Sequence, residues 1–294
     1  MSALQTAAGR IAGLVGRESW LIRRMRPAYE SLLEGLGGGR GAPWTINGIS
    51  YRIDPHHRQR LGKDYDAPVA AFLRERVKPG AVCVDVGANV GVYVLQFAHW
   101  SAPSGHVIAF EPNPGARAVL ENHILFNGLG GRVTVVPAAV SSSAGIATLY
   151  ADGADGMSRL NEPHDEMVGR ARELSVTTVT LDEYCARARV SPDWLFIDIE
   201  GFEIVALEGA RNLIESRGAA LGIVVEMHPN AWAAAGTERA QLERLLKELK
   251  LEPAPLTGQT DALGEHGLVY LSRSYSDVHT GATIKLGARA SLPA

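Results

Sequence analysis

The chain has 294 residues and a formal net charge of −3, and 46% of its residues are hydrophobic and 21% charged. This composition is typical of a globular protein and excludes a collagen-like, coiled-coil or largely disordered chain. Residues 1–60 are basic, with nine Lys and Arg against four Asp and Glu, whereas the remainder holds 20 against 28. Nucleic acid is therefore not an expected partner, because the acidic body repels phosphate groups.

The sequence shows neither a membrane-spanning segment nor a secretion signal. No stretch approaches the ~20 apolar residues of a membrane-spanning helix, and residues 1–20 lack the basic start and continuous apolar core of a secretion signal. We therefore expect a cytoplasmic protein. Cys83 and Cys185 have no CxxC spacing, so neither a disulfide framework nor a zinc site is expected.

The first 62 residues predict a small extension in front of the main domain. A helix is expected over 16–35, ended by the glycine-rich stretch 37–41. Residues 44–53 alternate apolar and polar side chains around Asn47-Gly48, which predicts a hairpin. The arginines at 23, 24 and 26 fit the solvated side of that helix, or a contact to an anionic surface or a subunit.

From residue 63 to 275 the pattern predicts one α/β domain. Short apolar runs alternate with helical segments, which is typical of a mostly parallel sheet with helices on both faces. The polar segment 151–172 is expected to be a loop that covers the acceptor site, and 276–294 a flexible tail. Strands are expected at 82–86, 107–110, 133–137, 194–199, 221–226 and 267–271, and helices at 67–77, 93–99, 116–122, 204–214 and 237–251.

A glycine-rich turn follows the first of these strands. It reads Asp-x-Gly-x-x-x-Gly over Asp85–Gly91, and Asn89 replaces the glycine that would admit a pyrophosphate. This favours a cofactor without phosphates, such as S-adenosylmethionine, although such glycines also serve packing alone. Glu111 ends the next strand about 20 residues later, where a carboxylate accepts hydrogen bonds from ribose hydroxyls.

Acidic side chains follow two later strands. Asp198 and Glu200 come after one, and Glu226 and His228 after the other, at the same predicted edge of the sheet. Carboxylates there are costly to desolvate unless they bind a ligand, a cation or one another. Glu203 fits equally well as a residue flanking the next helix, and His228 also fits an ordinary surface position.

These stretches together resemble the FkbM family of S-adenosylmethionine-dependent methyltransferases. The resemblance covers roughly 64–252 and implies the class I methyltransferase sheet of seven strands, with an antiparallel last strand at 267–271. It also implies O-methylation of a hydroxyl on a sugar, polyketide or related metabolite. Family members usually carry a lysine where this chain has Phe196. The matching stretches are VDVGANVG at 84–91, FEPNP at 110–114, NG at 127–128, VPAAVS at 136–141, TLD at 180–182, DIEGFE at 198–203, EGA at 208–210 and EMHP at 226–229.

The expected partners are a small hydroxylated acceptor and, in a homo-oligomer, further copies of the chain. For catalysis we expect Asp198, Glu226 and His228, either without metal, which is slightly preferred, or with Mg²⁺ held by Asp198 and Glu226. A nicotinamide-dependent oxidoreductase and a non-catalytic cofactor-binding protein are the alternatives. The expected cofactor-binding residues are Asp85, Gly87, Ala88, Asn89, Gly91, Glu111, Pro112, Ala139 and Asp198.

Overall fold

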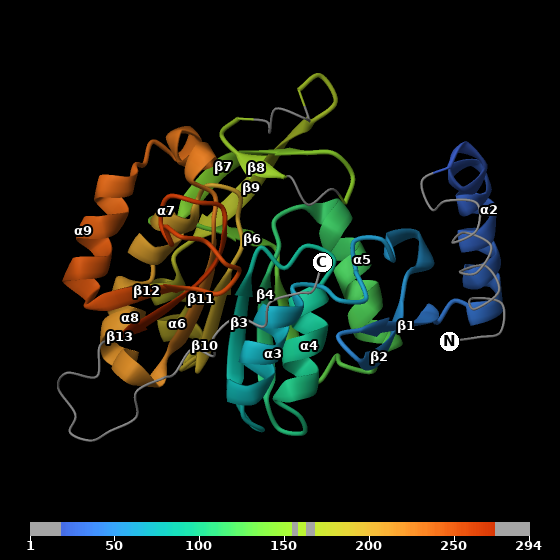
Figure 1. The fold of residues 1–294 in the computed structure, drawn as a ribbon, viewed down its shortest axis with the longest axis horizontal. Coiled ribbons are helices and arrows are strands. Elements are labelled where there is room, and N and C mark those ends of the chain that lie inside the picture. The colour runs from blue at the N-terminus through green and yellow to red at the C-terminus, as the bar shows by residue number, and fades with distance from the viewer. Residues whose placement is uncertain (1–18, 155–157, 163–167, 274–294) are drawn as a thin grey trace, which may run out of the picture.

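A seven-stranded sheet forms the centre of the computed structural model, which describes residues 19–154, 158–162 and 168–273 (Figure 1). β13 is antiparallel to both of its neighbours, and every other neighbouring pair is parallel. This arrangement confirms the predicted α/β fold with its antiparallel last strand. In spatial order the strands are β12 (Leu251–Pro255), β13 (Gly267–Arg273), β11 (Gly222–Met227), β10 (Trp194–Ile197), β3 (Val82–Val86), β4 (His106–Phe110) and β5 (Val133–Val136).

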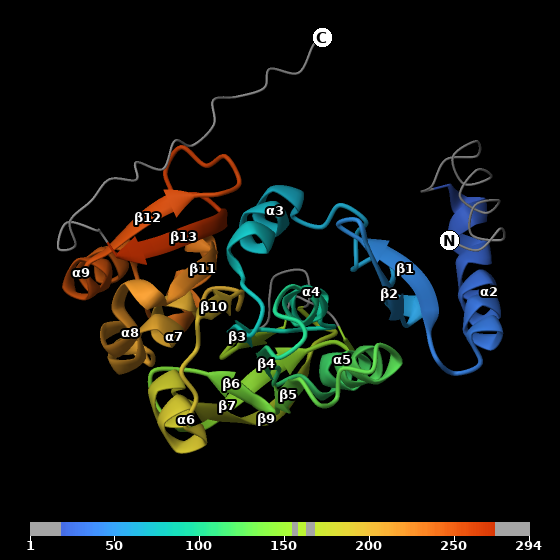
Figure 2. The same ribbon diagram turned by 90° about the horizontal axis from the view of Figure 1, so that it is seen from below.

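The strands are apolar because helices cover both faces of the sheet. Alternate residues of a strand point to opposite faces, so Cys83 packs in one core with α3, α4 and α5, and Val84 packs in a second core with α6 to α9. Figure 2 shows these two helix layers on opposite sides of the sheet. The helices are α3 (Ala67–Arg76), α4 (Val92–Trp100), α5 (Pro114–Phe126), α6 (Leu181–Ala188), α7 (Glu203–Glu208), α8 (Arg211–Arg217) and α9 (Arg239–Leu249), with 3-10 turns at Gly218–Ala220 (η3) and Pro229–Ala235 (η4).

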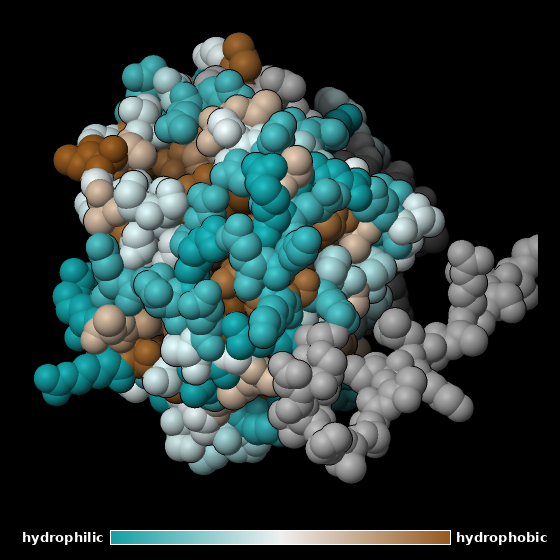
Figure 3. Space-filling model, turned by 90° about the vertical axis from the view of Figure 1, so that its left-hand side faces the viewer, coloured by the Kyte–Doolittle hydropathy of each residue, from teal (hydrophilic) through white to brown (hydrophobic). Residues whose placement is uncertain are grey.

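α9 packs on the sheet through a stripe of four buried leucines, at 242, 245, 246 and 249, as their spacing predicts. The face of the molecule that carries α9 is mainly hydrophilic (Figure 3). One predicted helix is wrong: residues 204–214 form two helices, α7 and α8, separated at Gly209. A Cβ at Gly209 would lie 2.1 Å from the backbone oxygen of Ser141, so the chain breaks its helix where it packs directly on another backbone segment.

The N-terminal extension contains the predicted helix and hairpin. α2 (Trp20–Gly37) precedes β1 (Ala42–Ile46), β2 (Ile49–Ile53) and the 3-10 turn η1 (Pro55–His57). Asn47 and Gly48 form the hairpin turn with φ values of 48° and 82°. Asn127, at the end of α5, donates to and accepts from the backbone of Arg52. The hairpin is thereby fixed to the main domain, and α2 lies on its outer side (Figure 2).

A second sheet of four strands lies over the end of the first and was not predicted. In the order β6-β9-β7-β8 it contains β6 (Ala138–Val140), β9 (Arg172–Val179), β7 (Gly145–Ala151) and β8 (Arg159–Leu160). The expected loop over 151–172 is therefore wrong in part, because its ends belong to β7 and β9 and β8 lies inside it. Residues 155–157 and 163–167 of that loop and the expected tail at 276–294 lie outside the described residues. Among the described helices, none is long and apolar enough to cross a membrane.

Candidate functional site

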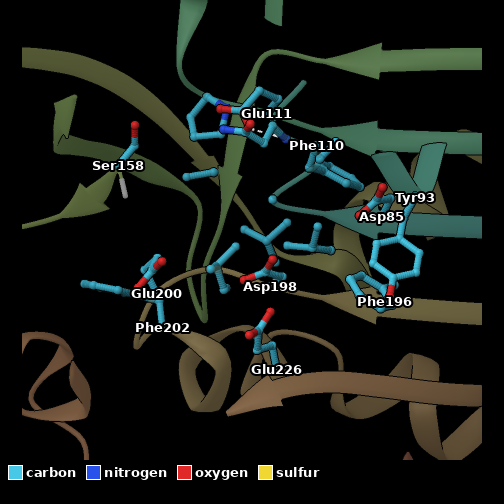
Figure 4. Close-up of a pocket in the computed structure, with 18 of the residues that line it drawn as sticks. Asp85, Tyr93, Phe110, Glu111, Ser158, Phe196, Asp198, Glu200, Phe202 and Glu226 are labelled. Atoms are coloured by element: carbon cyan, nitrogen blue, oxygen red, sulfur yellow. Dashed lines mark hydrogen bonds between the residues drawn. The ribbon is translucent and has the colours of Figure 1, made fainter. Parts of the chain in front are cut away.

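A cavity of about 500 Å³ opens where the parallel strands β3, β4, β10 and β11 end (Figure 4). Carboxyl ends of parallel strands are the usual ligand-binding edge of such sheets. Of the residues predicted from the sequence for cofactor binding and catalysis, all except Gly91 line this cavity. Residues that are far apart in the chain, such as Asp85 and Glu226, thus share one site.

The glycine turn brings backbone close to backbone on the floor of this cavity. Gly87 has a φ of 87°, and a Cβ there would lie 1.9 Å from the backbone oxygen of Asp198. No other residue type fits this position without displacing the end of β10. Gly91 serves packing instead, because its Cβ would lie 2.5 Å from Leu120 Cδ1 on α5.

Glu111 is held by two backbone hydrogen bonds at the end of β4. Its Oε2 accepts from the Asn89 N–H and its Oε1 from the Asn113 N–H, both at 2.7 Å. Burial raises the pKa of Glu111 to about 7, although these two bonds and Arg117 oppose the shift. Each carboxylate oxygen has a further lone pair, so the group can accept two more hydrogen bonds from a ligand diol.

Asp85 lies beneath the glycine turn and is 2% exposed. Burial, together with the nearby charges of Asp198 and Glu111, raises the pKa of Asp85 well above its ordinary value. Its Oδ2 has no hydrogen-bond partner among the described residues. The environment of Asp85 therefore favours its protonated form, and Oδ2 is available to a ligand in the cavity.

The carboxyl groups of Asp198 and Glu226 face each other across the ends of β10 and β11 (Figure 4). Burial is the main cause that raises both pKa values, that of Glu226 to about 7, and proximity adds to the shift of Asp198. Each of two carboxyls this close disfavours ionisation of the other.

Behind this pair, a buried carboxylate holds His228. Glu203 is fully buried; its Oε1 accepts from the Gly201 N–H and lies 2.7 Å from His228 Nδ1, and its Oε2 accepts from Trp232 Nε1 at 2.9 Å. Burial lowers the pKa of His228, but Glu203, Asp198 and Glu200 outweigh it and raise the value to about 9. Glu203 thus flanks α7, as one interpretation of the sequence has it, and also orients the histidine.

Several lining residues were not predicted. Phe196, where the family usually has lysine, stacks on Tyr93 with ring centroids 3.9 Å apart and makes this wall apolar. His266 Nε2 lies 3.0 Å from Glu226 Oε1. One ligand atom each of Glu226, His228 and His266 lies within 4.8 Å of the others, a spacing that can hold a metal ion. This set includes Glu226 but not Asp198, which the sequence pattern had favoured as its partner. Arg60, Tyr65 and Glu200 also line the cavity.

Residues 85–252, more than half of the chain, match the methyltransferase FkbM domain. The 31-O-demethyl-FK506 methyltransferase FkbM of Streptomyces tacrolimicus is 42% identical over 85 residues, which are 28% of this chain and 32% of that protein. Hexuronic acid methyltransferase AglP of Haloferax volcanii is 28% identical over 187 residues, which are 62% of this chain and 68% of that protein.

The solved structure of methyltransferase FkbM from Methylobacillus flagellatus aligns with a TM-score of 0.43 and 16% identity, over 66% of this chain and 43% of that one. Strand order and the family match, rather than this distant likeness, establish the fold. The chain belongs to the FkbM family of S-adenosylmethionine-dependent methyltransferase domains.

Proposed function

We propose that this protein transfers the methyl group of S-adenosylmethionine to a hydroxyl group of a sugar, a polyketide or a related small metabolite. The observation that carries the proposal is the buried Glu203–His228 pair, whose histidine lines the cavity next to the carboxyls of Asp198 and Glu226. The relatives named for a demethylated polyketide and for hexuronic acid support this acceptor class. The family match gives no support to the nicotinamide-dependent alternative.

The cofactor supplies the electrophile, so the protein mainly has to align the acceptor oxygen and remove its proton. The oxygen–carbon bond forms as the carbon–sulfur bond breaks, and the hydroxyl proton passes to His228 Nε2. Glu203 keeps the other ring nitrogen protonated and so fixes the tautomer. Neutral histidine is the form that accepts the proton; because the pKa of His228 is about 9, this form becomes more populated as the pH rises, and the positive sulfonium favours it further.

In this proposal the cofactor lies along the glycine turn. The methionine part occupies Asp85–Gly91, and the ribose hydroxyls donate to Glu111, while Pro112 and Ala139 line the same end of the cavity. Asp198 and Glu226 bind hydroxyl groups of the acceptor. A non-catalytic protein with this fold would bind the cofactor and show no transfer to any hydroxylated acceptor.

Replacing Glu111 with Ala is expected to weaken cofactor binding by about 1.5–3 kcal/mol, because charge-assisted hydrogen bonds to the ribose are lost. In the unchanged protein the Kd should rise as the pH falls below about 7, where Glu111 becomes protonated. Titration calorimetry with S-adenosylmethionine at pH 6 and 8 measures both effects. The control is Glu121→Ala on the exposed side of α5. Unchanged affinity and pH dependence in Glu111→Ala would contradict the assignment.

Replacing Asp198 with Asn, or Glu226 with Gln, is expected to lower turnover by at least about tenfold, since the shape is kept and the charge removed. Folding should survive or improve, because two close buried carboxyls repel each other. Methyl transfer and melting temperature are compared with Glu215→Gln, an exposed change on α8. Normal turnover with a large loss of melting temperature would show a structural network instead.

A divalent cation at Glu226 and His228 is the second candidate mechanism, favoured by their closeness to His266. Of the predicted Mg²⁺ ligands it would use Glu226 directly, with Asp198 beside it. Chelation separates the mechanisms: the histidine base predicts an unchanged rate in the presence of EDTA, whereas a metal mechanism predicts a loss that added Mg²⁺ restores.

A further inference from the structure

The charges of the cavity do not match all the charges of the cofactor. S-adenosylmethionine carries a sulfonium and an ammonium, which suit an acidic cavity, and one carboxylate, which does not. Five carboxyl groups line the cavity, on Asp85, Glu111, Asp198, Glu200 and Glu226. A carboxylate placed among them needs a cation of its own.

Four basic side chains line the same cavity, and three of them are engaged elsewhere. His228 is held by Glu203 and His266 by Glu226. Arg159 is on β8, and its Nη1 lies 4.0 Å from Glu162 Oε1; its neighbour Ser158 accepts a hydrogen bond from Asn113 Nδ2. That position is near Glu111, at the proposed ribose end. The fourth is Arg60.

Arg60 lines the cavity from the N-terminal extension. It follows η1, and its N–H donates to the His57 oxygen at 3.0 Å. The same segment is fixed to the turn through His123, whose Nε2 accepts from the Asp54 N–H at 2.9 Å and whose Nδ1 lies 2.7 Å from the Val90 oxygen. The N-terminal extension thus carries a cation to the place where the methionine part is proposed to lie.

The guanidinium of Arg60 also has an unused donor. Its Nη1 is buried and has no hydrogen-bond partner among the described residues, and no carboxylate among them forms an ion pair with it. A buried donor without a partner is costly, whereas a planar guanidinium matches a carboxylate in geometry and charge.

We propose that Arg60 binds the carboxylate of the methionine part of S-adenosylmethionine. This assignment rests on the proposed function, in which the methionine part lies along Asp85–Gly91. It makes the N-terminal extension part of the proposed cofactor site, and it gives a role to a basic side chain that pairs with none of the five described carboxyl groups of the cavity.

Decarboxylated S-adenosylmethionine is the discriminating probe, because it keeps both positive charges and lacks only the carboxylate. Arg60→Gln should weaken binding of S-adenosylmethionine to the full-length protein by about ten- to hundredfold and leave the affinity for the decarboxylated compound nearly unchanged. Arg60→Lys should recover part of the lost affinity for S-adenosylmethionine, because the lysine ammonium keeps the positive charge but not the planar geometry of the guanidinium. The matched control is Arg58→Gln in the same segment, where Arg58 pairs with Glu30 at 3.3 Å and does not line the cavity.

Equal losses for both compounds would overturn the assignment and indicate a structural role for Arg60. Unchanged cofactor affinity with a raised KM for the acceptor would overturn it too, because Arg60 would then bind the acceptor. If the unchanged protein binds neither compound, the proposed function itself fails, and this result is distinct from a failure of Arg60 alone.

Discussion

Replacing His228 with Asn is expected to lower methyl transfer by about a hundred- to ten-thousandfold, the usual contribution of a positioned general base. The side chain stays polar and similar in size, and cofactor affinity should change little, because the proposed cofactor contacts lie at Glu111 and the glycine turn. Transfer from labelled S-adenosylmethionine to a panel of hexuronic acid glycosides and polyketide alcohols measures the rate. An undiminished rate in this variant would exclude His228 as the base.

The variant Glu203→Gln tests the Glu203–His228 pair through the pH dependence of kcat/KM. His228 is faced by Glu203 from α7, by Asp198 and Glu200 after β10, by Glu226 of β11 and by His266 before β13. Because Glu203 raises the pKa of His228, the rise of kcat/KM with pH should move to lower pH in Glu203→Gln, with a lower maximum. Trp232→Phe is the control, since it removes the other side-chain donor to Glu203 and leaves His228 in place. A profile that shifts equally in both variants would indicate a general disturbance of the fold.

The sequence alone predicted the strands that end at the site. Runs 107–110 and 194–197 are short, apolar and followed by an acidic residue, whereas β3 and β11 carry theirs one position before the end of the strand. The order of strands therefore brings these carboxyls, on Asp85, Glu111, Asp198 and Glu226, to one edge. Predicting which side chains lie at such strand ends requires no knowledge of how the helices pack on the sheet. Most of the proposed cofactor site follows from this local pattern.

The rest of the site depends on contacts that no local pattern encodes. His266 reaches Glu226 because β13 pairs with β11 in the register Met227↔Gly267, and Glu203 reaches His228 because α7 turns back over the end of β11. Arg60 reaches the cavity because the hairpin packs on α5 through Asn127 and His123. The division into an extension at 1–62 and a domain at 63–275 stays a prediction, but Arg60 ties the first part to the site of the second.

The strands that were not predicted from the sequence were also hidden because the local pattern does not show their pairing. β12 contains Pro253 and Pro255, which argue against a central strand and are tolerated here because β12 is at the edge. β7 and β9 expose many of their side chains, as at Ile146, and therefore lack the continuous apolar run that marks the central strands. Their sheet becomes visible only when its pairing is known.

The largest effect on stability is expected for Gly87→Ala. An added Cβ would lie 1.9 Å from the backbone oxygen of Asp198. The chain cannot easily move away from this contact, because the end of β10 is fixed in the sheet and the backbone φ of 87° is itself unfavourable for alanine. The strained φ is expected to lower the free energy of unfolding by about 1–2 kcal/mol, and the overpacking by about 1–3 kcal/mol more. Since Asp198 follows the end of β10, the shift that relieves the clash should also disturb the proposed cofactor and acceptor sites together.

Gly128→Ala separates the two causes, because Gly128 has a φ of 66° and no atom within 4 Å of its added Cβ. That variant should lose only the backbone contribution and keep its affinity for S-adenosylmethionine. Thermal unfolding and calorimetric titration of both variants make the comparison. Gly87→Ala should melt several degrees below Gly128→Ala, at roughly 2–4 °C per kcal/mol for a chain of this size class, and should bind the cofactor much more weakly. Equal melting temperatures and equal affinities would show that the end of β10 moves freely, and the glycine turn would then not be the rigid floor of the site.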